Sequence, residues 1–132
     1  MLRRFVSAAS VGAVVVGLAG PLLYLNPLPT PEGRYIVATV WCMVPLAWGI
    51  WAMLLPATWV PGRIPLWGAL LGVLAGIIAA FVLDMPYRLF DAPTSTAVKL
   101  GIVVLAVVLY GLVWIAVREV YSRLGGAVGG TN

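Results

Sequence analysis

The sequence predicts an all-α membrane protein, with four transmembrane helices in an antiparallel bundle and both termini in the cytoplasm. Hydrophobic residues make up 63% of the 132 residues and charged residues 9%, which is too little polar surface for a soluble domain of this size. Four apolar runs are each long enough to cross a bilayer. The length of the chain leaves room for little besides these four runs, so we expect residues 1–124 to form a single transmembrane domain.

The first predicted helix covers residues 5–25 and follows a short basic head with Arg3 and Arg4. The run is uncharged and rich in Val, Ala and Gly, and Pro21 near its end bends or closes the helix. The basic head and the small residues of 17–19 also fit a cleavable signal peptide, but the apolar run is longer than a normal signal core. We therefore expect this segment to remain as a membrane span.

The second predicted helix covers residues 35–56, follows a proline-rich loop and is rich in tryptophan. Trp41, Trp48 and Trp51 fall near one face of this helix. Two interpretations are open for these rings: ordinary packing against helices or lipid tails, or contact with a pigment, a quinone or a specific lipid. Pro45 removes one backbone hydrogen bond, so we also expect a kink in this span.

The third predicted helix, residues 65–84, carries the feature around which the chain is organised. Gly68, Gly72, Gly76 and Ala80 recur every four residues and form one face of the helix, the small-residue face. Such a face is almost bare backbone and lets another helix approach closely. The neighbour is either a helix of the same chain or a partner helix, from a second copy or from another protein.

The same four-residue series ends at Asp84, the only acidic residue that continues a transmembrane face. Its position at the end of the span, beside Pro86, predicts a hydrated carboxylate at the membrane boundary that pairs with Arg88, and not an ion site at mid-membrane. Asp91 belongs to the same polar connection. We therefore predict that Asp84, Arg88 and Asp91 lie at the interface between membrane and water.

The fourth predicted helix covers residues 97–118. Lys99 stands near its start, where a long side chain can reach the lipid headgroups. Asp91 or one of the hydroxyl residues at 94–96 caps its first turn. The glycine-rich residues 125–132 are predicted to form a flexible tail.

The distribution of basic residues predicts the orientation, because cytoplasmic ends of membrane helices carry an excess of Lys and Arg. With the N-terminus inside, five basic residues lie in the cytoplasm and three lie on the other side. The first set is Arg3, Arg4, Arg63, Arg118 and Arg123, and the second set is Arg34, Arg88 and Lys99. We expect a multi-pass protein of a bacterial plasma (inner) membrane.

The residue types exclude several kinds of chemistry. The chain has no histidine, one cysteine and four acidic residues, which excludes His-ligated haem or zinc and Ser–His or Cys–His catalytic pairs. No span has a charge at its centre, which argues against ion-coupled transport. The eight basic residues are scattered and form no nucleic-acid patch. We predict no catalytic residue, cofactor, metal or nucleic-acid partner.

These observations favour a non-catalytic accessory, structural or assembly subunit of a larger respiratory, photosynthetic or transport complex. Such a subunit acts through helix–helix contacts and through lipid or pigment packing. Its partners are the bilayer and other membrane-protein subunits, or further copies of itself. The alternative is a homo-oligomeric channel or carrier for a small solute, in which the small-residue faces line or assemble a pore.

Overall fold

The computed structural model is all-helical in the part of the chain that it describes, residues 1–25, 31–85, 87, 91 and 93–129. Four of its helices are long and apolar enough to cross a membrane. They are α1 (Leu2–Leu25), α2 (Pro31–Met53), α3 (Ile64–Ile77) with its π-helical continuation η2 (Ile78–Val82), and α5 (Thr96–Gly129). This part of the prediction is confirmed: the fold is helical, with four candidate membrane spans.

The observed helices extend beyond several predicted boundaries. α1 begins at Leu2, so the basic head is helical, and α2 begins at Pro31. Proline suits the first turn of a helix because an N–H there would have no partner. α5 continues to Gly129, so residues 125–129, predicted as part of a flexible tail, are helical. An established helix gains one hydrogen bond for each residue added, which explains its continuation through several glycines.

The third span changes its helical geometry before it ends. The α-helical part stops at Ile77 and η2 continues it as a π-helix, in which the N–H of Leu83 donates to the carbonyl of Ile78 at 2.8 Å. Asp84 then takes a positive φ of 46°, which turns the chain out of the helix. The wider π turn alters the positions of the residues that follow, so the four-residue series does not extend to Asp84 as a regular α-helical face.

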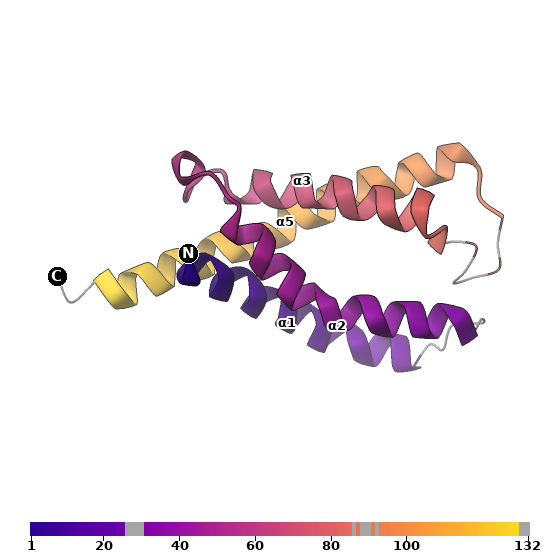
Figure 1. Ribbon diagram of the computed structural model, residues 1–132, viewed down its shortest axis with the longest axis horizontal. Coiled ribbons are helices and arrows are strands. Elements are labelled where there is room, and N and C mark those ends of the chain that lie inside the picture. The colour runs from indigo at the N-terminus through magenta and orange to yellow at the C-terminus, as the bar shows by residue number, and fades with distance from the viewer. Residues whose placement is uncertain (26–30, 86, 88–90, 92, 130–132) are drawn as a thin grey trace.

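The helices are arranged as two pairs, α1 with α2 and α3 with α5 (Figure 1). In the first pair, a Cβ added at Gly12 of α1 would lie 3.2 Å from the Cα of Pro45 of α2. In the second pair, Gly68 of α3 lies nearest Trp114 of α5, and Gly76 lies nearest Val103. Figure 1 shows the pairs meeting near the end that holds the N-terminus and diverging toward the other end.

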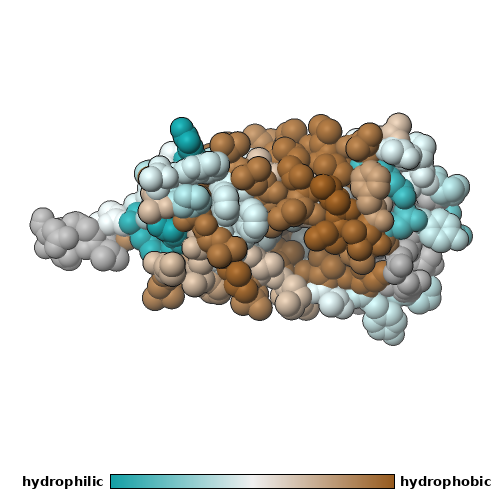
Figure 2. Space-filling view, turned by 45° about the horizontal axis from the view of Figure 1, so that its top comes forward, coloured by the Kyte–Doolittle hydropathy of each residue, from teal (hydrophilic) through white to brown (hydrophobic). Residues whose placement is uncertain are grey.

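The buried core lies where the two pairs meet, and all four spans contribute to it. Its residues are Ala8, Val11, Trp48, Ala52, Leu55, Ile64, Trp114 and Val117. Away from this junction the helices keep large apolar side chains on the outside, and Figure 2 shows them as a broad apolar surface between more polar ends. Lipid tails are as apolar as these side chains, so this surface suits a bilayer.

Candidate functional site

The small-residue face of α3 is buried against α5 of the same chain. A Cβ at Gly72 would lie 2.7 Å from the carbonyl oxygen of Ala106 and 2.9 Å from the Cα of Val107. A Cβ at Gly76 would lie 2.8 Å from the Cα of Val103. These close partners are backbone atoms, so the two helices approach until their main chains almost touch. Of the two interpretations of this face, the contacts fit packing within the chain.

Gly68 and Ala80 stand at the two ends of the same face. Trp114 of α5 packs directly over Gly68, and its indole occupies the space that a side chain at position 68 would need. Ala80 is fully buried within η2. The face therefore receives one very large side chain at its first position, which anchors α3 against α5.

Two groups of contacting aromatic rings, here together called the aromatic junction, join the two helix pairs. The junction consists of Trp48, Trp51, Trp67, Tyr110 and Trp114. The ring of Trp48 in α2 lies 5.3 Å from the ring of Tyr110 and 5.9 Å from that of Trp114, both in α5, with tilted planes. Tilted aromatic pairs at such distances attract each other beyond the effect of burial alone. The junction therefore ties α2 to α5.

Two tryptophans of the aromatic junction bond each other's backbone. The rings of Trp51 and Trp67 stack at a centroid distance of 4.7 Å and an angle of 18°. The indole N–H of Trp51 donates to the carbonyl of Trp67 at 2.9 Å, and that of Trp67 donates to the carbonyl of Trp51 at 2.8 Å. The N–H of a buried indole usually has such an acceptor. This reciprocal pair connects α2 to α3.

The tryptophans singled out in the sequence thus have different surroundings. Trp48 is only 5% exposed, and Trp51 is half-buried in the aromatic junction, so both pack against the protein's own helices. Trp41 lies half-buried on α2, outside the buried core, and contact of its ring with lipid or pigment stays a prediction. Sequence reasoning missed Tyr110 and Trp114. The available signal was their spacing of four residues, which matches that of the glycines they cover.

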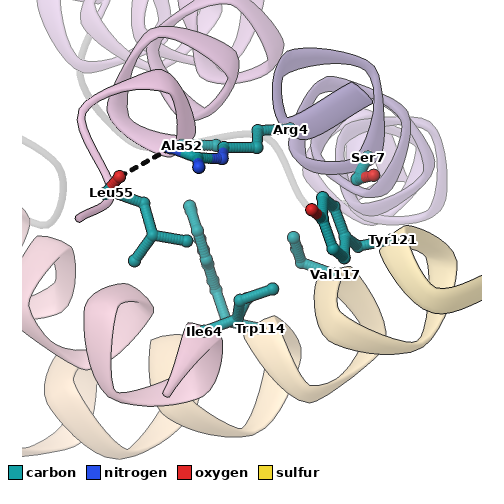
Figure 3. Close-up of a pocket in the computed structure, with 8 residues that line it drawn as sticks. All are labelled: Arg4, Ser7, Ala52, Leu55, Ile64, Trp114, Val117 and Tyr121. Atoms are coloured by element: carbon teal, nitrogen blue, oxygen red, sulfur yellow. Dashed lines mark hydrogen bonds between the residues drawn. The ribbon is translucent and has the colours of Figure 1, made fainter. Parts of the chain in front are cut away.

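A cavity of about 10 Å³ lies where the pairs meet, which is roughly the space of one water molecule. It is lined by Arg4, Ser7, Ala52, Leu55, Ile64, Trp114, Val117 and Tyr121 (Figure 3). Arg4 reaches across from α1 and donates from Nη1 to the carbonyl of Leu55 at 2.7 Å. The basic head is therefore part of the helix contacts, and its cation meets the carbonyl end of α2, where positive charge is favoured.

At the other end of α3, Asp84 pairs with Lys99 of α5. Oδ1 of Asp84 lies 3.5 Å from Nζ of Lys99, an ion-pair distance that is too long for a strong hydrogen bond. The Asp84 side chain is 41% exposed, although the Oδ1 that faces Lys99 is itself buried and makes no hydrogen bond, so water reaches only the rest of the carboxylate. The predicted partner, Arg88, lies outside the described residues, and Asp91 is exposed.

The start of α5 is capped by a hydroxyl group. The N–H of Val98 donates to Oγ of Ser95 at 3.3 Å. Among the capping residues that the sequence offers, Ser95 therefore fills the position just before the helix. Lys99 follows in the first turn, with its Nζ 5.7 Å from the ring centre of Phe81, so that α5 begins beside the end of the third span.

The fold and these contacts define a class: a helical protein with four candidate membrane-spanning helices, arranged as two pairs around an aromatic junction. The chain matches no family model, no curated protein and no solved structure. Within the described residues, no group of three or more His, Cys, Asp or Glu side chains lies close enough to hold a metal ion. The proposals below therefore rest on the chain's own residues.

Proposed function

We propose that this protein is a non-catalytic subunit of a larger membrane complex, with an accessory, structural or assembly role. The observation that carries the proposal is the contrast between α3 and α5. α3 turns its small-residue face inward, whereas α5 presents a row of large apolar side chains to the outside, each 50–62% exposed. They are Val104, Leu105, Val108, Leu109 and Leu112. In a bilayer such side chains lie against lipid tails or pack against the helix of a partner, and the proposal assigns this face of α5 to a partner.

In this proposal the four spans form an antiparallel bundle in a bacterial plasma membrane, with both termini in the cytoplasm. The order of contacts along α3 and α5, from Gly68 with Trp114 to Gly76 with Val103, supports the antiparallel arrangement. The hydrogen bond from Arg3 to the carbonyl of Tyr121 holds the first and last spans together at one end. The excess of arginines at this end supports the placement of this end on the cytoplasmic side of the membrane.

The orientation predicts the behaviour of reporter fusions. Alkaline phosphatase, which is active only outside the cytoplasm, is expected to be inactive when fused after Asn132 and active when inserted after Pro93. Green fluorescent protein fused after Asn132 is expected to fluoresce. Phosphatase activity of the Asn132 fusion in intact cells would contradict the proposed topology.

The accessory role predicts that the outer face of α5 binds a partner. Truncating Leu105 and Leu109 together to alanine is expected to weaken association with the complex by about tenfold in the dissociation constant, which corresponds to ~1.4 kcal/mol. The measurement is native electrophoresis of mild-detergent extracts from the source cells. The matched control truncates Leu70 and Leu74, two exposed leucines on α3, and is expected to leave the complex intact.

Two results would contradict the accessory role. One is a protein that migrates without any other subunit before and after the substitutions. The other is solute flux through liposomes that contain only the purified protein, which the channel or carrier alternative predicts. In that alternative the exposed face of α5 joins copies of the same chain, and the Leu105 and Leu109 truncations abolish the flux.

A further inference from the structure

The net charge of the chain is concentrated at one end of the fold. Five arginines, here called the arginine end, belong to this region: Arg3, Arg4, Arg63, Arg118 and Arg123. With the single acidic residue Glu119 they account for the whole formal net charge of +4, because the other three basic and three acidic residues cancel. Figure 2 shows hydrophilic residues at this end, directly beside the apolar surface.

Contacts between helices bring these arginines together. Arg3 donates from Nε to the carbonyl of Tyr121 at 2.8 Å, and its guanidinium lies 3.6 Å from the centre of the Tyr121 ring. It also lies against Gly125, where any side chain would collide with it. Arg4 lines the same cavity as Ile64 and Val117, the sequence neighbours of Arg63 and Arg118. Arginines distant in the sequence therefore surround one end of the fold.

Most of this positive charge has no carboxylate partner within the described residues. The ion pair at this end joins Nε of Arg123 to Glu119 at 2.9 Å, and both side chains are largely exposed. Arg3 and Arg4 bond to carbonyl oxygens, which satisfy hydrogen bonds without neutralising charge. Arg63 lies 5.5 Å from the centre of the Trp59 ring, and Arg118 is exposed. A half-buried guanidinium without a counter-charge favours the approach of an anion.

We propose that the arginine end binds the phosphate groups of anionic phospholipids in the leaflet that it faces. The guanidinium group forms paired hydrogen bonds with phosphate oxygens, and Trp59 beside Arg63 is a residue typical of the headgroup level. Because the apolar surface begins directly beside this hydrophilic end (Figure 2), a phospholipid whose phosphate binds here can lay its acyl chains along the helices. The proposal rests on the membrane-spanning architecture and is independent of any partner subunit.

The test uses the purified full-length protein in detergent, titrated with phosphatidylglycerol or with phosphatidylcholine of the same acyl chains. The readouts are native mass spectrometry of bound lipid and the thermal unfolding midpoint. We expect phosphatidylglycerol to bind more tightly, and the preference to weaken as salt is added. Each arginine near the surface is expected to contribute about fivefold to this preference.

The variant R63Q with R118Q removes two exposed charges without touching the hydrogen bonds of Arg3 and Arg4. It is expected to reduce the preference for phosphatidylglycerol about 25-fold. The matched control, R34Q, removes a charge at the opposite end and is expected to leave the preference within about twofold, because headgroup attraction falls off within a Debye length. An unchanged preference in R63Q/R118Q would overturn the proposal.

Two further measurements distinguish a lipid phosphate from a soluble phosphate as the ligand. Inorganic phosphate and glycerol 1-phosphate, at the concentration at which phosphatidylglycerol raises the unfolding midpoint, are expected to have no effect. Equal stabilisation by these soluble anions, or equal binding of phosphatidylcholine, would show that the arginine end does not select anionic lipids. No other protein is present in this experiment. A negative result would therefore contradict lipid binding at the arginine end without contradicting the proposed accessory role.

Discussion

Replacing Gly72 by alanine is expected to destabilise the protein by about 1–3 kcal/mol, the usual effect of forcing an extra methyl into a packed contact. The new Cβ would lie 2.7 Å from the carbonyl oxygen of Ala106 and 2.9 Å from the Cα of Val107. Both are backbone atoms of α5 and cannot rotate away, so the two helices have to separate. The loss of contact then extends along the small-residue face.

The matched control, Gly101→Ala on α5, is expected to have the opposite sign. Nothing lies within 4 Å of a Cβ at this position, so only the helix propensity changes. Alanine is favoured over glycine inside a helix by about 0.5–1 kcal/mol. The measurement is the free energy of unfolding in mixed micelles, followed by tryptophan fluorescence. Equal effects of the two substitutions would show that α3 and α5 are not in close contact in the membrane-embedded protein.

The second large effect is expected at Trp114, whose replacement by alanine should cost about 3–5 kcal/mol. Its side chain is fully buried, covers Gly68 and lies 5.9 Å from the ring of Trp48. Removing it leaves a cavity where the two helix pairs meet. Leu112→Ala, on the exposed side of the same helix, is the control and should change the unfolding free energy by at most about 0.5 kcal/mol.

A double substitution tests the contact directly. Gly68→Leu alone is expected to destabilise the fold, because the leucine would occupy the space of the Trp114 indole. Combined with Trp114→Ala, the same leucine fills part of the cavity, so the double variant should be more stable than the sum of the single effects by about 0.5–3 kcal/mol. Strict additivity would contradict direct packing of Trp114 on Gly68.

Each of the four predicted apolar runs lies in a helix, although several boundaries differ, because length and apolar composition restrict what a chain can do in a bilayer. A backbone in lipid has to satisfy its own hydrogen bonds, and the helix does so within one segment. The apolar composition from Leu66 to Ile77 was enough by itself to predict that these residues form part of a span. The spacing of Gly68, Gly72 and Gly76 also indicated close approach of another helix, since it depends only on the helical repeat.

Other features depended on contacts between residues far apart in the sequence. The series from Gly68 to Asp84 assumes regular α-helix, whereas η2 is a π-helix and Asp84 meets Lys99 instead of continuing the face. Trp48 stands at mid-span, where the sequence favoured packing over ligand contact without showing which helix it packs against. Its position against Tyr110 depends on how the two pairs meet.

By itself, the sequence determined that this chain has four helices able to span a membrane and one face of bare backbone, because both follow from local repeats and composition. Only the tertiary structure decided that the face receives Trp114 of α5, that the aromatic junction joins the two pairs, and that Arg3 and Arg4 bond to neighbouring helices. Those outcomes depend on which side chains fit together in three dimensions, and no repeat along the chain encodes that fit.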